Sequence, residues 1–399
     1  MKDILIVANY IVAPDETGNG RFNYIAKKLS LESNCNVELV SSVFSHYKKS
    51  KRKKDLNFKE YKLTLLQEPG YKKNISLKRF YSHWILSRNL KIYLKKRKKP
   101  DVIYCAVPTL SLAKVVTQYA KKNKIKLIID IQDLWPEAFK MIFNPPIIGK
   151  YIYMPMEKKA DYIYKNADEI IAVSETYVER GVKVNKKIKT GYSIFLGNDQ
   201  EEYDKLKLNN NLFKNKNEFW LIYVGTLGHS YDLESVIKAL KFLKETENIL
   251  NIKFIVLGSG PLEVKFINYA KELKVNVEFL GRVEFKKVVQ YLEKADLVIN
   301  PIKPGSAASI INKVGDYAAS GKAVVNTQES IEYRNLLNEY NAGINCELGS
   351  LKDLAEKIKY LYENKEIREK LGKNNRKMFE EKFDRKKTYG KIIELIEGD

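Results

Sequence analysis

Cysteine and long apolar runs are scarce in this chain of 399 residues. Its three cysteines, Cys35, Cys105 and Cys346, are too few and too scattered for a disulfide framework or a metal cluster. No stretch approaches the roughly 18 uncharged apolar residues that span a bilayer. The first residues, MKDILIVANYIV, include an aspartate and lack a small-residue cleavage site, so they indicate a buried strand and not a signal peptide. We therefore expect a globular cytoplasmic protein.

Motifs of several common enzyme classes are missing as well. The chain has neither the GxGxxG fingerprint of dinucleotide enzymes nor the GxxxxGK[ST] loop of NTPases, which counts against both classes. It also has no Asp-X-Asp triplet and no His/Cys cluster with the spacing of metal ligands. We expect no metal and no cofactor.

Acidic residues are under-represented in the first half. The formal net charge is +22, and residues 1–200 carry 38 Lys+Arg against 19 Asp+Glu, a net +19 that leaves only +3 for the rest. Excess positive charge attracts anionic partners. Nucleic acid is not expected, because no basic-helix, zinc-finger or aromatic RNA-reading motif is present.

Two basic runs flank a segment that mixes aromatic and cationic residues around position 84. Such a helix can rest on an anionic membrane, with its apolar side in the interface. The alternative is an ordinary lysine-rich surface in water. We expect a peripheral protein at the inner face of the cell membrane, with these contact residues: Lys51, Arg52, Lys53, Lys54, Trp84, Lys95 and Lys96.

Short apolar runs alternate with helical-length amphipathic segments along the whole chain. This pattern is typical of βαβ units with buried parallel strands. The expected strands form two series, 4–8, 37–40, 102–107, 126–131 and 169–174, then 219–225, 252–258, 277–281, 297–301 and 323–327. A polar, Asn-rich stretch separates them. The fold class is therefore α/β, with two Rossmann-like doubly wound domains that face a central cleft.

Glycines follow several of these strands. Gly18 and Gly20 precede a helix, and Gly225 and Gly228 do so in the second half, where backbone amides and the helix dipole can face a diphosphate. An ordinary strand-to-helix turn would also use glycine.

A Gly/Ser/Ala-rich loop leads to Lys313 and, three residues later, Asp316. The cation suits a leaving diphosphate, and the carboxylate can accept both hydroxyls of a ribose. The alternative is a surface ion pair between the two side chains.

The order of YVGTLG, LGSGP, GRV, ADLVINP and NKVGDYAASGKAVVNT resembles the family 4 retaining glycosyltransferases with the GT-B fold. DLWPEAF, ADEIIAVSE and FLGND are similar to the branch that makes bacterial capsules and O-antigens. The resemblance implies a nucleotide-sugar donor, an acceptor held by the N-terminal domain, and transfer with retention. The implied domains are 1–196 for the acceptor and 197–380 for the nucleotide-sugar, with 381–399 as a helix that crosses back to the first domain.

Three departures from the family limit this transfer of roles. The first of two family glutamates falls on Ala308, the usual Arg and Lys fall on Thr226 and Tyr231, and the usual histidine falls on Gln132. Asp133 then becomes the candidate group that faces the reacting sugar, although it could instead cap the next helix.

The predicted function is transfer of a sugar, on a UDP donor, to a polyprenyl-diphosphate saccharide in capsule, O-antigen or exopolysaccharide synthesis. The alternatives are a weakly active binding subunit and a nucleotide-sugar epimerase. The candidate catalytic residues are Asp133 and Lys313. The candidate donor-binding residues are Gly18, Gly20, Gly225, Thr226, Gly228, Arg282, Ser306, Ser309, Asn312 and Asp316.

Overall fold

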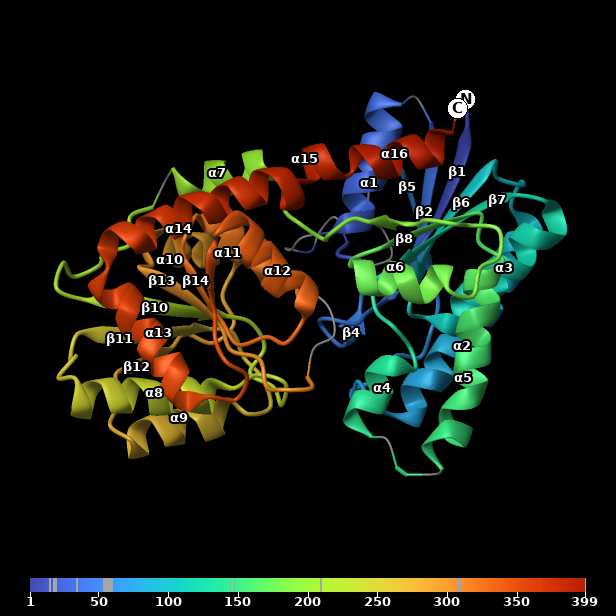
Figure 1. Ribbon diagram of the computed structural model, residues 1–399. Coiled ribbons are helices and arrows are strands. Elements are labelled where there is room, and N and C mark those ends of the chain that lie inside the picture. The colour runs from blue at the N-terminus through green and yellow to red at the C-terminus, as the bar shows by residue number, and fades with distance from the viewer. Residues whose placement is uncertain are drawn as a thin grey trace. The chain divides into compact units, whose positions relative to one another are not determined.

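The computed structural model describes residues 1–13, 16, 20–33, 35–52, 60–143, 145–146, 148–208, 210–306 and 310–398. They form two compact α/β units, which are Met1–Ile194 with Tyr389–Asp399, and Phe195–Thr388 (Figure 1). The first division lies two residues before the one predicted. Residues 381–388 belong to the second unit, because Asp384 and Arg385 pair with the backbone of Asn198.

The first unit alternates strands and helices, as the apolar pattern predicts. Its elements are β1 (Asp3–Val7), α1 (Arg21–Glu32), β2 (Asn36–Ser42), β3 (Phe44–Ser45), β4 (Ser50–Lys51), β5 (Lys62–Leu66), α2 (Leu77–Lys96), β6 (Val102–Val107), α3 (Leu110–Asn123), β7 (Lys126–Ile131), α4 (Glu137–Ile142), α5 (Gly149–Lys165), β8 (Glu169–Ala172), α6 (Glu175–Val182), β9 (Tyr192–Ser193) and α16 (Gly390–Glu397).

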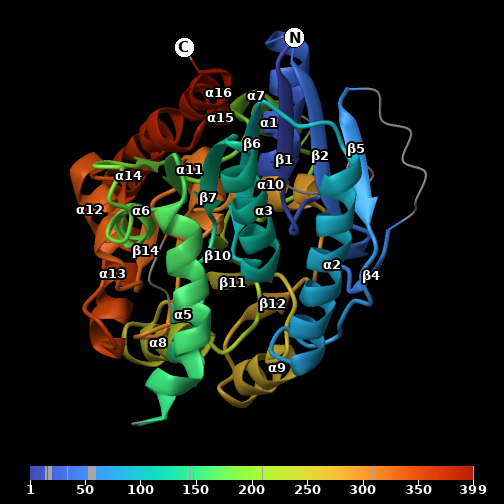
Figure 2. The same ribbon diagram turned by 90° about the vertical axis from the view of Figure 1, so that its right-hand side faces the viewer.

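Among the described residues of this unit, seven parallel strands form one sheet in the order β5-β2-β1-β6-β7-β8-β9. Helices α1 and α16 cover one face, where Ile4, Ile25 and Ile392 share a core cluster. Helices α2, α3 and α5 lie side by side on the other face (Figures 1 and 2). The C-terminal helix is thus part of the core of the first unit.

The second unit repeats this architecture. Its elements are α7 (Gln200–Lys207), β10 (Phe219–Val224), α8 (Leu233–Thr246), β11 (Ile252–Leu257), α9 (Glu263–Glu272), β12 (Val277–Phe279), α10 (Phe285–Lys294), β13 (Leu297–Asn300), α11 (Lys313–Ser320), β14 (Val324–Asn326), α12 (Ile331–Tyr340), β15 (Gly343–Asn345), α13 (Leu351–Glu363), α14 (Lys365–Met378), the π-helical turn η1 (Phe379–Phe383) and α15 (Arg385–Thr388).

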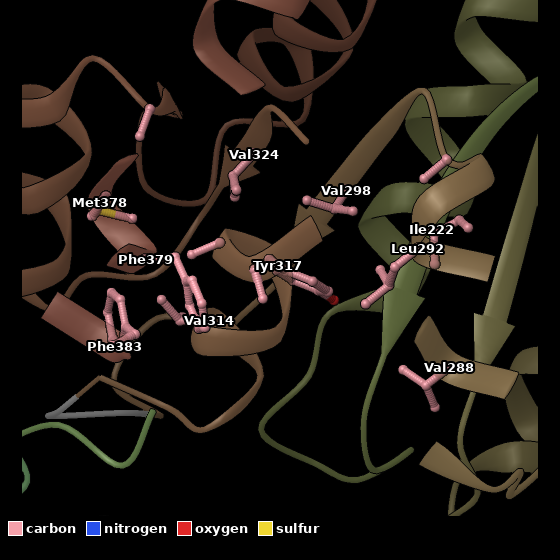
Figure 3. Close-up of a cluster of buried hydrophobic side chains, with 14 of the residues drawn as sticks. Ile222, Val288, Leu292, Val298, Val314, Tyr317, Val324, Met378, Phe379 and Phe383 are labelled. Carbon is pink, nitrogen blue, oxygen red and sulfur yellow. The ribbon is translucent and has the colours of Figure 1, made fainter. Parts of the chain in front are cut away.

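In the described part of this unit, six parallel strands follow the order β12-β11-β10-β13-β14-β15. Leu221 and Tyr223 of β10 enter a core with α8, α9 and α13. Ile222, one residue from each, enters the opposite core with α10, α11 and η1, part of which Figure 3 shows. Both faces of the sheet are therefore buried, which explains the continuous apolar runs.

The strand order reverses beside the first strand of each unit. Strand β1 lies between β2 and β6, and β10 lies between β11 and β13. Ligands of open α/β sheets bind at the carboxyl ends of the strands at such a reversal. The loops after β1, β6, β10 and β13 are consequently where a site is expected.

Candidate active site

Lys313, the first residue of α11, is buried between two aromatic rings. Its ammonium nitrogen lies 3.9 Å from the centre of the Tyr223 ring and 4.1 Å from that of Tyr231. The side chain is 7% exposed, and Nζ has no hydrogen-bond partner among the residues that the structure describes. Burial holds the pKa of Lys313 well below its ordinary value. A buried cation without an anion is unfavourable, so this position favours an anionic ligand.

Gly225, at the end of β10, leaves room for that ammonium. It has φ +146°, and a Cβ atom there would lie 3.1 Å from Lys313 Nζ and 3.0 Å from the Tyr223 hydroxyl. Gly258, after β11, also has φ +146°, and its Cβ would meet the Gly225 carbonyl oxygen at 1.8 Å. Side chains are thus excluded at both strand ends by backbone conformation and by space.

Gly228 lies in the same loop but is not required by packing. A Cβ there would meet only Thr226 Cγ2, at 3.7 Å, and the Thr226 side chain is exposed. The Thr226 carbonyl oxygen accepts a hydrogen bond of 2.7 Å from the Tyr223 hydroxyl. The Tyr223 hydroxyl thus holds the loop on its buried side, while the side that carries Thr226 is exposed, so a ligand can approach the loop backbone.

Tyr317 anchors helix α11 to the two strands at the reversal. Its hydroxyl accepts a 2.9 Å hydrogen bond from Val224 N–H and donates one of 3.0 Å to the Ile299 carbonyl. Val314 and Tyr317 lie in the core shown in Figure 3. These contacts hold the start of α11, and therefore Lys313, at the end of β10.

Asp316 is partly buried one turn into α11. It accepts a 2.5 Å hydrogen bond from Asn198 Nδ2. Burial raises the pKa of Asp316 to about 6, against the opposing effects of the Asn198 hydrogen bond and the Arg385 charge. The alternative of a surface ion pair with Lys313 is wrong, because Lys313 is buried and Asp316 bonds elsewhere.

The remaining donor-binding candidates are scattered around the same edge. Arg282 and Asn312 are exposed, and Asn312 precedes α11 without capping it through its side chain. Ser306 is half-buried, and its N–H donates to the Lys303 carbonyl at 3.1 Å. Ser309 lies outside the described residues, as does Ala308.

In the first unit, Asp133 follows β7 and is partly buried. It accepts hydrogen bonds from Trp135 Nε1 at 3.1 Å and from the Tyr177 hydroxyl at 3.4 Å. Burial raises the pKa of its carboxyl. The N-cap of α4 is Pro136, so the alternative that Asp133 caps this helix is wrong.

Gly20 is the N-cap of α1, and Gly18 lies outside the described residues. The next residue, Arg21, is buried and pairs with Asp130, with 2.8 Å between Nε and Oδ2. Gln132, at the family's histidine position, donates to Asp130 Oδ1 at 2.6 Å. Residue Gln132 therefore supports the buried pair, which the sequence analysis did not predict.

The predicted membrane residues divide into two groups. Trp84, Lys95 and Lys96 are exposed on α2, and Lys51 is exposed on β4. Arg52 is 8% exposed and donates to the carbonyls of residues 11, 42 and 44 and to Glu16, so its prediction as a membrane contact is wrong.

Lys53 and Lys54, the other two predicted membrane residues, lie outside the described residues. None of the helices in the described ranges has the length and apolarity to cross a membrane. The same ranges contain no group of three His, Cys, Asp or Glu side chains arranged to hold a metal.

Comparison with known proteins places a family model on the second unit. Residues 204–378 match the model described as glycosyl transferases group 1.

Three curated relatives cover most or about half of the chain. An uncharacterized glycosyltransferase, MJ1178, of Methanocaldococcus jannaschii is 25% identical over 64% of this chain and 65% of the relative. The capsular polysaccharide biosynthesis glycosyltransferase CapM of Staphylococcus aureus is 24% identical over 73% and 75%. The GalNAc-alpha-(1->4)-GalNAc-alpha-(1->3)-diNAcBac-PP-undecaprenol alpha-1,4-N-acetyl-D-galactosaminyltransferase of Campylobacter jejuni is 26% identical over 54% of each. The chain thus spans slightly less than two thirds of the first relative.

Solved structures match nearly the whole chain. Sucrose-phosphate synthase from Thermosynechococcus elongatus has a TM-score of 0.76 at 15% identity, over 99% of this chain and 98% of the other. Anabaena HepE in complex with UDP has a TM-score of 0.71 at 15% identity, over 100% of both. At this identity the likeness concerns the fold. The chain has the GT-B fold, and its residues 204–378 carry the pattern of glycosyl transferases group 1.

Proposed function

We propose that this protein is a retaining glycosyltransferase, which moves a sugar from a UDP-sugar to a polyprenyl-diphosphate-linked saccharide in capsule, O-antigen or exopolysaccharide synthesis. One observation carries the proposal: the ammonium of Lys313 is buried without a partner in the described residues, at the strand-order reversal of the second unit. A diphosphate is the anion that such a position suits.

The neighbouring residues suit the rest of a nucleotide-sugar. The loop at Gly228 and the start of α11 offer backbone N–H groups and a helix dipole to the diphosphate, whereas the Gly225 N–H already donates to the Leu257 carbonyl. Asp316, as a carboxylate, has acceptor sites for both ribose hydroxyls beyond the one that Asn198 uses.

The comparisons support this class of substrate. The Anabaena structure holds UDP, the Staphylococcus relative is named for capsular polysaccharide biosynthesis, and the Campylobacter relative for an undecaprenyl-diphosphate acceptor. These properties are those of the other proteins, and the proposal extends them to this chain.

In the proposed reaction an acceptor hydroxyl oxygen bonds to the anomeric carbon as the bond from that carbon to the diphosphate oxygen breaks. The hydroxyl proton passes to the departing phosphate on the same face of the sugar, so no protein nucleophile is needed. Lys313 and the backbone amides stabilise the charge that develops on the diphosphate. Asp133 is the proposed group of the first unit that faces the reacting sugar.

We also propose that the first unit rests on an anionic membrane, where a lipid-linked acceptor resides. Helix α2 exposes Leu77, Tyr81 and Trp84, and the segment between α4 and α5 exposes Phe143 and Ile148. The rings of Phe80 in α2 and Phe139 in α4 lie 5.8 Å apart, which ties the two apolar segments together. The net charge of +19 over residues 1–200 complements anionic lipid.

Thermal shift with UDP, GDP, ADP and their sugars tests the donor. A ligand at 100 times its Kd stabilises the folded state by about 2.7 kcal/mol. We expect the uridine compounds to raise the Tm most. Product analysis with UDP-sugars, with and without a polyprenyl-diphosphate saccharide, then tests transfer. A new glycosidic product that requires the acceptor supports the proposal, free epimerised sugar indicates an epimerase, and binding without turnover indicates a binding subunit.

A further inference from the structure

A second buried cation, Arg79 of α2, lies in the first unit without a carboxylate partner. Its guanidinium carbon is 4.6 Å from the centre of the Trp135 ring, 5.5 Å from that of Tyr71 and 5.6 Å from that of Tyr10. The side chain is 8% exposed. One terminal nitrogen donates to the Asn74 carbonyl at 2.6 Å and the other to the Tyr10 hydroxyl at 2.7 Å. Nε has no partner among the described residues.

Two of the three histidines of the chain flank this guanidinium. His83 Nε2 lies 3.2 Å from the Tyr10 hydroxyl, and its ring stacks on Trp135. His46 Nδ1 lies 2.6 Å from the Tyr71 hydroxyl. Burial, together with the nearby positive charges, lowers the pKa of both histidines to about 3, so they are neutral at physiological pH.

Lys49 completes the group. Its Nζ lies 3.3 Å from His46 Nδ1 and 4.9 Å from the centre of the Tyr71 ring. Burial and the charge of Arg79 lower the pKa of Lys49 to about 8. The four side chains Arg79, His46, His83 and Lys49 are called the Arg79 cluster below.

The acids that face the Arg79 cluster are engaged with other groups. Glu68 is buried, accepts a 2.5 Å hydrogen bond from the Ser82 hydroxyl, and has its pKa raised by burial. Asp133 accepts from Trp135, and Glu16 pairs with Arg52. None of these carboxylates forms an ion pair with the cluster in the part of the chain that the structure describes, so its cations have capacity for an external anion.

The fold places the cluster where α/β sheets bind ligands. Tyr10, Tyr71 and Trp135 follow β1, β5 and β7, so three loops at the carboxyl edge of the seven-stranded sheet contribute. His46 follows β3, which pairs with β4 in the connection between β2 and β5. Asn9, two residues after β1, donates to the Thr109 hydroxyl after β6 at 3.1 Å across the reversal. The location repeats, in the first unit, that of Lys313 in the second.

The structure assigns the Arg79 cluster as a binding site for a phosphate group, and we propose that this is the diphosphate of the lipid-linked acceptor. The identity of the substrate rests on the function proposed above, whereas the site itself rests on the contacts of Arg79. The apolar part of such a ligand has a surface nearby, because the partly exposed Phe80 of α2 lies 6.4 Å, ring to ring, from Trp135.

The scarcity of histidine makes a direct test possible. The chain contains only His46, His83 and His229, so ¹⁵N-histidine NMR of the full-length protein resolves each ring. The probes are inorganic pyrophosphate and geranyl diphosphate, added with saturating UDP to occupy the second unit. We expect the signals of His46 and His83 to shift, and their pKa to rise from about 3, because a bound anion favours the charged rings. His229 is the internal reference.

Three outcomes decide the proposal. Tighter binding of geranyl diphosphate than of pyrophosphate supports a lipid-linked diphosphate, and equal binding overturns that identity in favour of free phosphate. Unchanged His46 and His83 signals with both probes overturn the site, even where transferase activity is present. Conversely, if the probes bind but the protein transfers no sugar, the phosphate site is supported and the proposed function is contradicted.

A variant pair extends the test to turnover. Lys49 has φ +54°, a conformation that asparagine tolerates, so Lys49→Asn keeps the fold while it removes the charge. We expect its KM for a soluble short-chain diphosphate acceptor to rise at least tenfold, with the KM for the UDP-sugar unchanged. The charge-matched control is Lys189→Asn at an exposed position of the same unit. Equal acceptor KM values in the two variants would contradict a role for Lys49.

Discussion

The ammonium of Lys313 lies 3.9 Å from the centre of the Tyr223 ring, where its nitrogen is buried and has no hydrogen-bond partner among the residues that the structure describes. Two tyrosine rings offset part of the cost of this burial through cation–π attraction, which amounts to about 0.5–2 kcal/mol for each ring. The rest of the cost is retained in the ligand-free protein. We therefore expect Lys313 to lower the free energy of unfolding of the ligand-free protein while it serves activity.

Replacing Lys313 tests this expectation. Lys313→Ala should lower turnover at least a hundredfold, on the order of 3 kcal/mol of lost charge stabilisation. Lys313→Met should lose as much turnover but raise the Tm of the ligand-free protein, because an apolar side chain replaces an unpaired buried cation. Steady-state kinetics and calorimetry check both, with the exposed Lys352→Ala as control. A methionine variant with wild-type turnover would remove Lys313 from the mechanism.

The pKa of Asp316, at about 6, predicts a pH dependence of nucleotide binding. Above pH 6 the carboxylate is charged and can accept ribose hydroxyls, and below pH 6 it is increasingly protonated. We therefore expect the affinity for a UDP-sugar, measured by calorimetry, to fall as the pH drops from 7 to 5.

The same shift affects stability with the opposite sign. The folded-state pKa exceeds the ordinary value of 3.8, so the stabilising contribution is present at low pH and is lost as the pH rises from about 4 to about 6. Asp316→Asn should bind the UDP-sugar weakly at every pH and unfold at pH 7 no more easily than the wild type. A variant that keeps the original pH profile of binding would show that another group titrates.

Gly225→Ala should be more damaging than a positive-φ glycine substitution elsewhere. At Gly225 the new methyl group meets Lys313 Nζ and the Tyr223 hydroxyl, whereas at Gly349, with φ +73°, it meets no atom within 4 Å. Backbone strain alone costs about 1–3 kcal/mol, and Gly349→Ala sets a lower bound for this part, because φ +73° is closer to the left-handed region than φ +146° is. Denaturant unfolding should show a larger loss for Gly225→Ala, together with weaker UDP binding. Equal losses of stability would mean that the Lys313 side chain moves away from the new methyl group without a measurable free-energy cost.

Breaking the buried pair of Arg21 and Asp130 should destabilise the first unit. Asp130 is fully buried and also accepts a 2.5 Å hydrogen bond from the Tyr104 hydroxyl. Asp130→Asn removes the carboxylate charge from the buried Arg21 guanidinium, at a cost of about 3–5 kcal/mol. The exposed pair of Lys386 and Glu201 is the control, since Glu201→Gln should change stability by less than about 1 kcal/mol. Chemical unfolding followed by circular dichroism distinguishes the two.

Sedimentation with anionic vesicles tests the proposed membrane contact. Joint replacement of Trp84 and Phe143 by alanine should weaken binding about tenfold or more, because each exposed aromatic loses its burial in the interface. Phe213→Ala, at an exposed position of the second unit, should have no effect. Added salt should also weaken binding. An affinity for vesicles that changes neither with the substitutions nor with added salt would contradict the proposal.

Local periodicity was sufficient to predict most of the fold. Each of the ten predicted strands corresponds to an observed one within two residues at either end, because a parallel sheet buried on both faces requires continuous apolar runs. The edge strands β5, β9 and β15 were missed, since their side chains are only partly buried and the pattern is weaker.

The candidate site was predictable only where its residues are adjacent in sequence. The loop leading to Lys313 and Asp316 stands out in the sequence, but the cage around Lys313 is assembled from the end of β10 and the loop beyond it. Tyr231, at a family position usually held by a cation, is the signal that could have indicated an aromatic neighbour.

Long-range contacts explain the failures. Arg52 belongs in sequence to a basic run typical of a surface, yet its guanidinium donates to the carbonyls of Ser42 and of Ile11, and Ile11 lies 41 residues away. The Arg79 cluster joins two residues of α2 with two of the turn between β3 and β4, so composition around Arg79 shows only another cationic, aromatic helix.

The position of helix α16 in the first unit has a consequence for biosynthesis. Ile392 and Ile396 are fully buried against the first sheet, and the Arg21 guanidinium lies 4.8 Å from the centre of the Tyr389 ring. These residues leave the ribosome after the whole of Phe195–Thr388. At about 5–20 residues per second, one face of the earlier sheet stays incompletely covered for about 10 to 40 seconds while the second unit is made. The nascent chain is therefore most exposed to aggregation and proteolysis during that interval, and a shortened C-terminus would make the exposure permanent.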